Sequence, residues 1–356
     1  MNGSAISFLS STLGSMVKST EMIDFVIPWV DGSDPEWRAE KALYLGSSMG
    51  IEDGDARYRD WGLLRYWFRG VEKFAPWVRK VHFVTWGHLP EWLNTDHPKL
   101  NIVYHEDYIP KKYLPTFSAN TIELNLHRIP NIAEHFVYFN DDTFLINDVR
   151  QRDFFINGMP RYTAVATPLK VGYDDWFFMS IVDNAVINHH FNFHNSVLSH
   201  PLKWFNPRYG IHTMRTISVL PYPYFCGIME FHLPNAFTKS AFEEVWEAEG
   251  ELLDRTCNNK TRSTLDVNQY LIKNWMIAKG DFYPLRASFG QTFQFRKNSD
   301  ITLAKLARYI KQGKGKTVCI NDSALMDNIE MVMISCQNIL EELLPMRSSF
   351  EKADMR

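Results

Sequence analysis

The sequence has few cysteines, no long apolar run and no large excess of one charge. Its 4 cysteines lie far apart without a Cys-x-x-Cys pair, which argues against a disulfide framework and a structural zinc site. No stretch reaches the ~20 apolar residues of a membrane-spanning helix. With 38 Lys and Arg against 41 Asp and Glu, the net charge is -3. This balance argues against a partner bound through a strongly basic surface, so no nucleic acid is expected.

Glycine-rich nucleotide motifs are also missing. No GxGxxG sequence follows a predicted strand, so a dinucleotide cofactor is not expected. The run 313–317 resembles the end of a P-loop, but the first glycine of that motif would fall at Ile310. Residues 1–21 lack a charged n-region and are interpreted as a flexible lead rather than a signal peptide. With the scattered cysteines, this predicts a cytoplasmic protein.

Short apolar runs alternate with helical patterns in the first half of the 356 residues. The predicted strands cover 23–30, 80–85, 101–104 and 135–139, and the predicted helices cover about 58–75, 90–93 and 118–129. Strands that alternate with helices predict an α/β fold with a mainly parallel, Rossmann-like sheet flanked by helices. Ligands of such sheets bind beyond the carboxyl ends of the strands.

The alternation fades after about residue 148, where aromatic, Pro, Asn and His residues become frequent. Helices are predicted at 238–251, 263–278 and 326–344, with a strand at 317–320. We expect one unit rather than two independent domains. Its predicted parts are the lead at 1–21, an α/β half at 22–150, an elaborated, more helical half at 151–325 and a C-terminal helix and tail at 326–356.

An acidic pair follows the last predicted strand of the first half. Asp141 and Asp142 would lie at the ligand-binding edge of the sheet, where adjacent like charges repel unless a cation or hydrogen bonds compensate them. Mg²⁺ bound to a diphosphate uses one or two carboxylates together with phosphate oxygens and water. The pattern favours a metal site, and a turn or helix cap is the alternative.

Other candidates are less distinctive. Glu123 and His127 stand four residues apart on a predicted helix and would face the same way, either at a phosphate or at solvent. Asn321 and Asp322 follow a short apolar run and form either an Asx turn or a second set of oxygen ligands. His232 alone is typical of a half-buried core histidine. The basic set that would neutralise phosphates or simply face solvent comprises Arg57, Arg59 and Arg65.

Several segments carry a further pattern when they are taken in order. They are 23–34 (IDFVIPWVDGSD), 57–65 (RYRDWGLLR) continued through 75–90 and 114–142, 231–234 (FHLP) with 262–266 (RSTLD), and 319–322 (CIND). These segments resemble the four conserved regions of the Stealth proteins, and the match spans about 23–322. Trp61-Gly62-Leu63 replaces the Asn-Gly-Glu expected in the animal enzymes, which favours the bacterial polysaccharide branch.

The resemblance implies a GT-A-like fold and a sugar-1-phosphate transferase. Such an enzyme moves a hexose-1-phosphate, here an N-acetylhexosamine-1-phosphate, from a UDP-sugar to a hydroxyl of a glycan or lipid-linked glycan. It forms a phosphodiester, releases UMP and depends on Mg²⁺ or Mn²⁺. We expect it in the bacterial cytoplasm, at the inner face of the membrane, with peripheral association. The alternatives are a metal-dependent GT-A-type glycosyltransferase and, given 14% aromatic residues, a non-catalytic sugar-binding module.

The resemblance also assigns site residues to this sequence. Its catalytic residues are Asp142, Glu123, His232 and Arg262, and the general base is one of the first three. Its substrate-binding residues are Asp31, Gly32, Asp34, Arg57, Asp60, Arg65, His127, Arg128 and Asp266. Its metal ligands are Asp141, Asp142, Asn321 and Asp322. The second half is therefore predicted to fold back and bring His232 and Arg262 to Asp142, inside one pocket.

Overall fold

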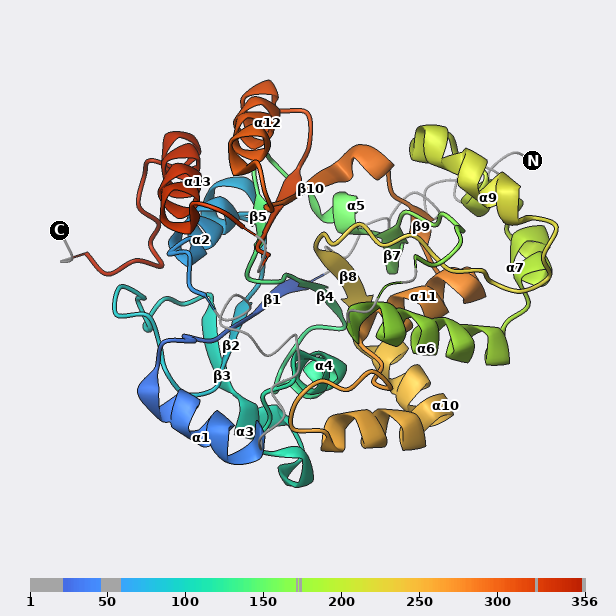
Figure 1. Cartoon of the computed structure of the whole chain (residues 1–356), viewed down its shortest axis with the longest axis horizontal. Helices are drawn as coiled ribbons and strands as arrows, with labels where there is room; N and C mark the ends of the chain where they lie inside the picture. The colour runs from blue at the N-terminus through green and yellow to red at the C-terminus, as the bar shows by residue number, and fades with distance from the viewer. Residues whose placement is uncertain (1–21, 46–58, 171, 173–174, 324–325, 354–356) are drawn as a thin grey trace, which may run out of the picture.

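The computed structural model describes residues 22–45, 59–170, 172, 175–323 and 326–353 (Figure 1). A five-stranded sheet lies at its centre with the strand order β3-β2-β1-β4-β8. The strands are β1 (Ile23–Trp29), β2 (Val81–Thr85), β3 (Leu100–Tyr104), β4 (His135–Tyr138) and β8 (Asn235–Thr238). The first four are parallel, and β8 is antiparallel to β4. The predicted α/β fold with a mainly parallel sheet is confirmed.

The sheet is apolar on both faces, which is why its strands appear in the sequence as nearly continuous apolar runs. Phe25 and Ile27 of β1 pack with α2 (Leu64–Phe74) in one core cluster. Val26 of the same strand faces the opposite cluster, which contains residues of α4 (Ala119–Leu124), α10 (Lys239–Asn258) and α11 (Gln269–Lys279). Helices therefore cover both faces of the sheet, as the alternating pattern predicts.

Two small sheets tie the second half of the chain to the first. One has the order β10-β11-β5, from Gly290–Gln294, Thr317–Asn321 and Thr143–Leu145. The other has the order β6-β7-β9, from Phe155–Ile156, Met159–Tyr162 and Tyr283–Pro284. Because β11 runs antiparallel to β5, it places Cys319 opposite Thr143, directly after the acidic pair.

Several shorter elements complete the described chain. The α-helices are α1 (Pro35–Leu45), α3 (His105–Tyr108), α5 (Gln151–Phe154), α6 (Asp175–His190), α7 (Phe193–Ser199), α8 (Pro201–Trp204), α9 (Thr213–Val219), α12 (Ser299–Gln312) and α13 (Ile329–Leu343). The 3₁₀ helices are η2 (Lys111–Tyr113), η3 (Leu126–Arg128), η4 (Pro207–His212) and η5 (Ala287–Phe289). None of the helices in the described ranges is both long and apolar enough to span a membrane.

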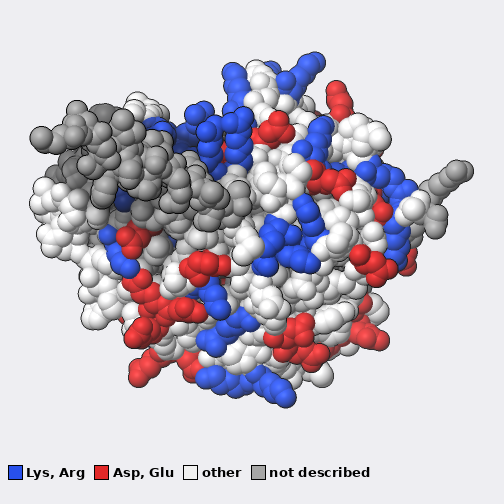
Figure 2. Space-filling model, turned by 180° about the vertical axis from the view of Figure 1, so that it is seen from behind, with Lys and Arg blue, Asp and Glu red and all other residues white. Residues whose placement is uncertain are grey.

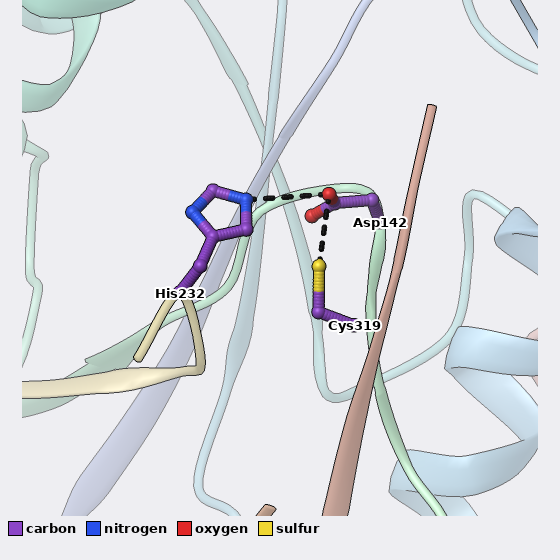
Figure 3. Close-up of side chains that lie close together, drawn as sticks. All are labelled: Asp142, His232 and Cys319. Atoms are coloured by element: carbon purple, nitrogen blue, oxygen red, sulfur yellow. Dashed lines mark hydrogen bonds and ion pairs between the residues drawn. The ribbon is translucent and has the colours of Figure 1, made fainter. Parts of the chain in front are cut away.

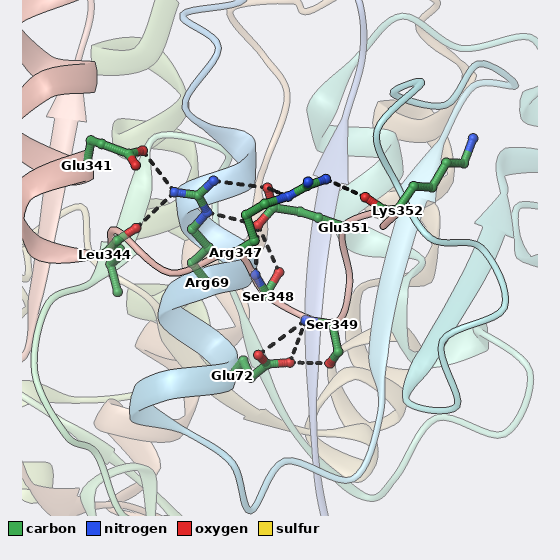
Figure 4. Close-up of polar contacts among 9 residues, drawn as sticks. All are labelled: Arg69, Glu72, Glu341, Leu344, Arg347, Ser348, Ser349, Glu351 and Lys352. Atoms are coloured by element: carbon green, nitrogen blue, oxygen red, sulfur yellow. Dashed lines mark hydrogen bonds and ion pairs between the residues drawn. The ribbon is translucent and has the colours of Figure 1, made fainter. Parts of the chain in front are cut away.

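A buried arginine on α2 forms hydrogen bonds with the C-terminal segment (Figure 4). Arg69 donates to both carboxylate oxygens of Glu351 at 2.8 and 3.1 Å, to Glu341 at 2.8 Å and to the Leu344 carbonyl at 2.9 Å. The Ser349 amide adds bonds to Glu72. A bidentate pair of this kind fixes geometry as well as charge, so it holds the segment after α13 against the domain.

The structure corrects four predicted helices. The helix predicted over about 58–75 begins at Leu64, and the described residues just before it, 59–63, are not helical. Residues 90–93 form a turn, because Leu93 is held in a bridge to Glu351. The helix predicted over 118–129 ends at Leu124, where the Asn125 side chain donates back to a backbone carbonyl and a 3₁₀ turn follows. The helix predicted from residue 263 begins only at Gln269, because the Asn268 side chain caps it.

Candidate active site

The predicted site lies where the strand order reverses, between the carboxyl ends of β1 and β4. The chain fills the sheet from β1 towards β3 and then crosses to β4, and such a switch point is the usual ligand-binding crevice of a doubly wound sheet. Asp31 follows the end of β1 by two residues, and Asp141 and Asp142 follow β4. The sheet therefore brings together acidic residues from two distant parts of the sequence.

Asp142 is the hub of the site (Figure 3). Its Oδ2 atom lies 3.3 Å from Nε2 of His232 and accepts a hydrogen bond from the Cys319 thiol at 3.1 Å. Its Oδ1 atom is buried and has no hydrogen-bond partner. A buried carboxylate oxygen without a donor is costly, so Oδ1 is chemically suited to bind a cation.

His232 enters the site from the loop before β8 in an unusual backbone conformation. Its φ is 44°, in the left-handed region that non-glycine residues rarely adopt. Its Nδ1 lies 3.2 Å from the Tyr270 hydroxyl on α11, so both ring nitrogens have partners. Burial favours the neutral imidazole, but Asp142, Glu123 and Asp141 outweigh it and raise the pKa of His232. A strained, charge-coupled and half-buried histidine is typical of a functional residue.

Negative charge accumulates along the same edge. Asp141 retains contact with solvent, yet the surrounding protein atoms, Asp142 and Asp60 raise its pKa to about 7. The protein around Asp60 and the charge of Asp31 raise the pKa of Asp60 as well, and Arg65 opposes this. The Asp60 carboxylate accepts a hydrogen bond from the Gly62 amide at 2.7 Å. The protein therefore supplies too few hydrogen-bond donors and positive charges to balance the negative charge of these carboxylates.

Glu123 and Arg262 form the other side of the site. Glu123 is buried on α4 and accepts a hydrogen bond from the Tyr138 hydroxyl at 2.8 Å. Its pKa is raised, because burial outweighs the opposing effects of Arg262, Tyr138 and His232. Arg262 comes from the loop between α10 and α11. The structure thus brings both His232 and Arg262 from the second half of the chain to the carboxylates of the first.

Asp266 holds the loop that carries Arg262. Its carboxylate is buried and accepts hydrogen bonds from the Ser263 amide at 2.8 Å and from the side chains of Asn259 at 2.6 Å and Asn120 at 3.2 Å. Asn120 lies on the helix that carries Glu123. These contacts explain how Asp266 positions Arg262 beside Glu123.

Asp31 and Asp34 organise the loop after β1. Asp31 Oδ1 accepts from the Ser33 amide at 2.9 Å, and Asp34 Oδ1 accepts from the Trp37 amide at the start of α1. Gly32 lies between them and is half-buried. Arg65 lies with its guanidinium 5.7 Å from the Trp92 ring, and Arg57 is outside the described residues. The loop is held by its own side chains, and the negative charge of Asp31 acts on Asp60.

The prediction that Glu123 and His127 share a helix face is wrong. Because α4 ends at Leu124, His127 turns into the core and stacks on Phe242 at 5.4 Å between ring centroids. Burial and nearby cations lower the pKa of His127 to about 3. Arg128 lies over the Trp246 ring at 4.8 Å. The described contacts of both residues are with α10, so the structure does not bring them to Glu123.

Asp322 is occupied by protein donors. Its Oδ2 accepts hydrogen bonds from Arg59 at 2.9 Å and from the Trp61 indole at 3.1 Å, and its Oδ1 accepts the Ser323 amide at 2.6 Å. Asn321 ends β11, where its carbonyl accepts the Phe295 amide. A metal at Asp322 would compete with Arg59. The contacts therefore support a structural link between the second and fourth motifs more directly than a metal site.

The residues around Asp142 fit a hard divalent cation. Ligand atoms of Asp142, His232 and Cys319 lie within 4.8 Å of one another, and Asp142 Oδ1 has no donor. Burial and the negative charge of Asp142 raise the pKa of the Cys319 thiol well above its usual value, so it is a neutral donor rather than a thiolate ligand. Carboxylate oxygens without thiolate suit Mg²⁺ or Mn²⁺ better than Zn²⁺.

Sequence reasoning missed three residues that contact the site. Cys319 belongs to the fourth quoted motif, which gave a signal that went unused. Tyr138 is the last residue of β4 and was interpreted as part of a strand. Tyr270 lies on a buried helix without any local signal. Their importance comes from contacts across the fold.

Comparison with known proteins gives consistent matches. Family models for Stealth protein conserved regions 1 and 2 match residues 21–49 and 57–162, which confirms the first two quoted regions. The capsular polysaccharide phosphotransferase WcwK of Streptococcus pneumoniae is 41% identical over 93% of this chain and 99% of its own length.

A second relative and one solved structure are also similar to the chain. The receptor polysaccharide phosphotransferase WefC of Streptococcus oralis is 38% identical over 92% of this chain and 99% of its own. Among solved structures, a complex of the galactosyltransferase LgtC with donor and acceptor sugar analogs has a TM-score of 0.38 and 10% identity, covering 90% of this chain and 95% of that chain. With its family-model matches and its near full-length relatives, the chain belongs to the Stealth family.

Proposed function

We propose that the protein transfers a hexose-1-phosphate from a UDP-sugar to a hydroxyl of a glycan acceptor, in bacterial polysaccharide synthesis. The observation that carries the proposal is the Asp142–His232 contact of 3.3 Å at the carboxyl edge of the sheet, beside an undercompensated acidic group. Relatives similar over nearly their whole length are polysaccharide phosphotransferases, which supports the class of reaction. An N-acetylhexosamine is the proposed sugar.

The proposed reaction is a displacement at the β-phosphorus of the donor. The acceptor oxygen forms the new phosphorus–oxygen bond, and the bond between the β-phosphorus and the bridging oxygen breaks. UMP leaves with the bridging oxygen, and the proton of the acceptor hydroxyl passes to a base. Such a step needs an in-line arrangement and charge neutralisation more than covalent help from the protein.

Asp141 and Asp142 are the proposed cation ligands. The fit rests on the unpartnered Oδ1 of Asp142 and on the raised pKa of Asp141, both of which a cation would relieve. Bound Mg²⁺ or Mn²⁺ supplies the positive charge that a diphosphate donor requires beside these carboxylates. Asn321 and Asp322 belong to the proposed site only if Arg59 releases Asp322.

His232 is the proposed general base. A base must reach a hydroxyl in the open part of the site, and the His232 side chain is 32% exposed whereas Glu123 is buried under Tyr138. Asp142 stabilises the imidazolium that forms when the ring takes the proton. Glu123 then keeps its role as the buried carboxylate that orients Arg262, and Arg262 contacts a phosphate or sugar oxygen of the donor.

The released nucleotide separates this reaction from its main alternative. A metal-dependent glycosyltransferase breaks the bond between sugar and oxygen and releases UDP, whereas phosphotransfer releases UMP. We would incubate the full chain with UDP-sugars, an acceptor glycan and Mg²⁺ or Mn²⁺, and separate the nucleotides. UMP that depends on acceptor supports the proposal. UDP supports glycosyl transfer, and sugar binding with no nucleotide release supports a non-catalytic module.

Asp142→Asn and Asp148→Asn make a matched pair for this assay. Asp148 is an exposed carboxylate on the same segment, outside the site. We expect acceptor-dependent UMP release to be lost in Asp142→Asn and kept in Asp148→Asn. Equal release by both variants would show that the acidic pair is only a cap and would contradict the proposal.

A further inference from the structure

The short helices of the second half expose an unusual amount of apolar surface. On α7 to α9, Leu198 is 77% exposed, Leu202 81% and Ile211 79%. Met214 and Ile217, three residues apart on α9, share one side and are 58% and 45% exposed. We call this surface, with Tyr222 and Tyr224, the α7–α9 face. A single exposed leucine needs no explanation, but a group on consecutive elements marks an interaction surface.

The same helices are also apolar on their inner side. Phe193, Val197, Trp204, Tyr209 and Val219 are buried in the core cluster. A helix that is apolar all round is normally buried all round. The α7–α9 face thus has the composition of a surface that is covered on both sides.

The charged residues of this part of the chain indicate what kind of surface covers the α7–α9 face. Residues 184–229 contain no Asp or Glu, in a chain that has 41 of them, and they include Lys203, Arg208 and Arg215. Burial, Arg208 and Arg286 lower the pKa of Arg161 and Asp153 opposes them, so positive charge exceeds negative charge around Arg161 beside η4. Figure 2 shows charges of both signs over the rear of the molecule and a mostly white margin on its left, below the grey atoms.

Aromatic residues add a third feature. Tyr222 and Tyr224 are 46% and 51% exposed, and their ring centroids lie 5.6 Å apart. Tyrosine rings with one apolar body and one polar tip are enriched where hydrocarbon meets water. Exposed aliphatic side chains, basic residues in a segment without Asp or Glu, and paired tyrosines together are the composition of a surface that lies on an anionic lipid bilayer.

We propose that the α7–α9 face lies on the surface of a membrane that contains anionic lipids, with its apolar side chains in the interface and its basic residues at the headgroups. The face is joined to the candidate active site through η4, because His212 packs against Phe231 at 5.8 Å and Phe231 precedes His232. If the proposed function holds, this contact would set the acceptor side of the site near the bilayer, where a lipid-linked glycan is held.

Vesicle binding tests the surface without depending on turnover. We would sediment the full chain with vesicles of phosphatidylcholine alone and with vesicles that also contain phosphatidylglycerol. The wild type should bind the anionic vesicles, with weaker binding at high salt. Leu202→Glu with Ile211→Glu, and separately Arg208→Glu with Arg215→Glu, should each weaken binding about tenfold or more.

Matched controls come from α1 and α12, which lie away from α7 and α9 (Figure 1). Leu43 on α1 is 82% exposed, so Leu43→Glu replaces an exposed leucine outside the α7–α9 face. Arg308→Glu on α12 reverses an exposed positive charge outside that face. The Leu43→Glu and Arg308→Glu proteins should both bind vesicles as the wild type does. Circular dichroism should show that all the variants are folded. Loss of binding in the controls, or no binding by the wild type, would overturn the proposal.

Two further outcomes are informative. A wild type that ignores vesicles but elutes as a dimer, which Leu202→Glu with Ile211→Glu separates, would assign the face to a second copy of the chain and contradict the proposal. Nucleotide release with a water-soluble acceptor should be unchanged in the face variants, because none of these residues lies in the proposed active site. Failure of nucleotide release with intact vesicle binding would therefore reject the proposed function and leave the membrane surface standing.

Discussion

The two ends of the central sheet place acidic residues in opposite electrostatic surroundings. Near the amino end of β1, Asp24 is fully buried and accepts hydrogen bonds from Arg79 at 2.5 and 2.8 Å, from the Ala133 amide at 2.8 Å, and pairs with His82 at 2.9 Å. Although burial opposes ionisation, these partners together lower the pKa of Asp24. Beyond the carboxyl end of β4, Asp141 is exposed, yet the surrounding protein atoms and the neighbouring carboxylates of Asp142 and Asp60 raise its pKa to about 7.

Asp24 at one end of the sheet therefore contributes to stability, whereas Asp141 and Asp142 at the other end are suited to bind a ligand. Every oxygen of Asp24 has a donor, so its charge is stabilised by the protein alone. Asp142 Oδ1 has none, and the negative charges of Asp142 and Asp60 outweigh the effect of His232 on Asp141. A fold tolerates such undercompensated charge when a ligand supplies the missing partner, and this cost is a common property of functional sites.

The largest expected effect comes from breaking the compensated end. Asp24→Ala leaves Arg79 and His82 without their shared carboxylate, and we expect a loss of about 3–5 kcal/mol in the free energy of unfolding. Chemical denaturation would measure it, with Asp148→Ala as the exposed control. A loss under about 1 kcal/mol would show that the pair is not important for stability.

Breaking the other end should affect activity instead. We expect Asp142→Asn to lower kcat by roughly 10²-fold or more, as for loss of a group that stabilises charge in the transition state. Its melting temperature should stay close to that of the wild type, because the Oδ1 atom of Asp142 has no donor to lose and an asparagine oxygen can still accept from the Cys319 thiol. Normal turnover would contradict the role of Asp142.

Substitutions of His232 and Arg262, which both come from the second half of the chain, should affect different kinetic constants. We expect His232→Ala to lower kcat by about 10²-fold with little change in the donor KM, because a general base acts on the acceptor proton. Arg262→Ala should raise the donor KM by about tenfold, the worth of a charged hydrogen bond. Steady-state kinetics with varied donor would show the division. Equal, small effects would indicate that the second half only supports the site.

The smallest effect has the opposite sign to that of Asp24. Because the folded state raises the pKa of Asp141 from 3.8 to about 7, its ionisation costs folding free energy as pH rises through this range. Asp141→Asn should therefore stabilise the metal-free protein by about 1 kcal/mol at neutral pH, a value reduced for solvent contact, with no gain below pH about 4. Unfolding curves across pH would test it, and destabilisation at neutral pH would contradict the coupling.

Asp24 has the reverse pH dependence. Its folded pKa is lowered, so its contribution is fully present above the unfolded value of 3.8 and disappears as pH falls through the lower, folded value. Unfolding curves of Asp24→Ala and the wild type should therefore converge in strong acid and diverge above pH about 4.

The sequence alone predicts the parallel sheet because its strands are apolar on both faces, and it predicts Asp141 and Asp142 because a strand ends just before them. It does not predict β8, since Asn235–Thr238 is too short to show a period and joins the sheet through pairing with β4. The shared face of Glu123 and His127 was wrong because a side-chain hydrogen bond from Asn125 ends the helix.

The site itself depends on contacts that no local pattern encodes. His232 was selected by family resemblance, and its contact with Asp142 requires the chain to return to the sheet after residue 148. Cys319 reaches Asp142 only because β11 pairs with β5, and Tyr270 reaches His232 only because α11 packs beside the sheet. The site therefore depends on contacts between segments that are distant in the sequence, and the periodicity of apolar residues does not predict such contacts.

The most direct test of the comparison is Mn²⁺ binding, measured by the loss of the free-ion electron paramagnetic resonance signal in the presence of UDP. We expect the wild type and Asp148→Asn to bind one ion, and Asp142→Asn and Asp141→Asn to bind far more weakly. Equal binding by all four proteins, or binding by none, would contradict the claim that the carboxylates after β4 are left undercompensated in order to hold a cation.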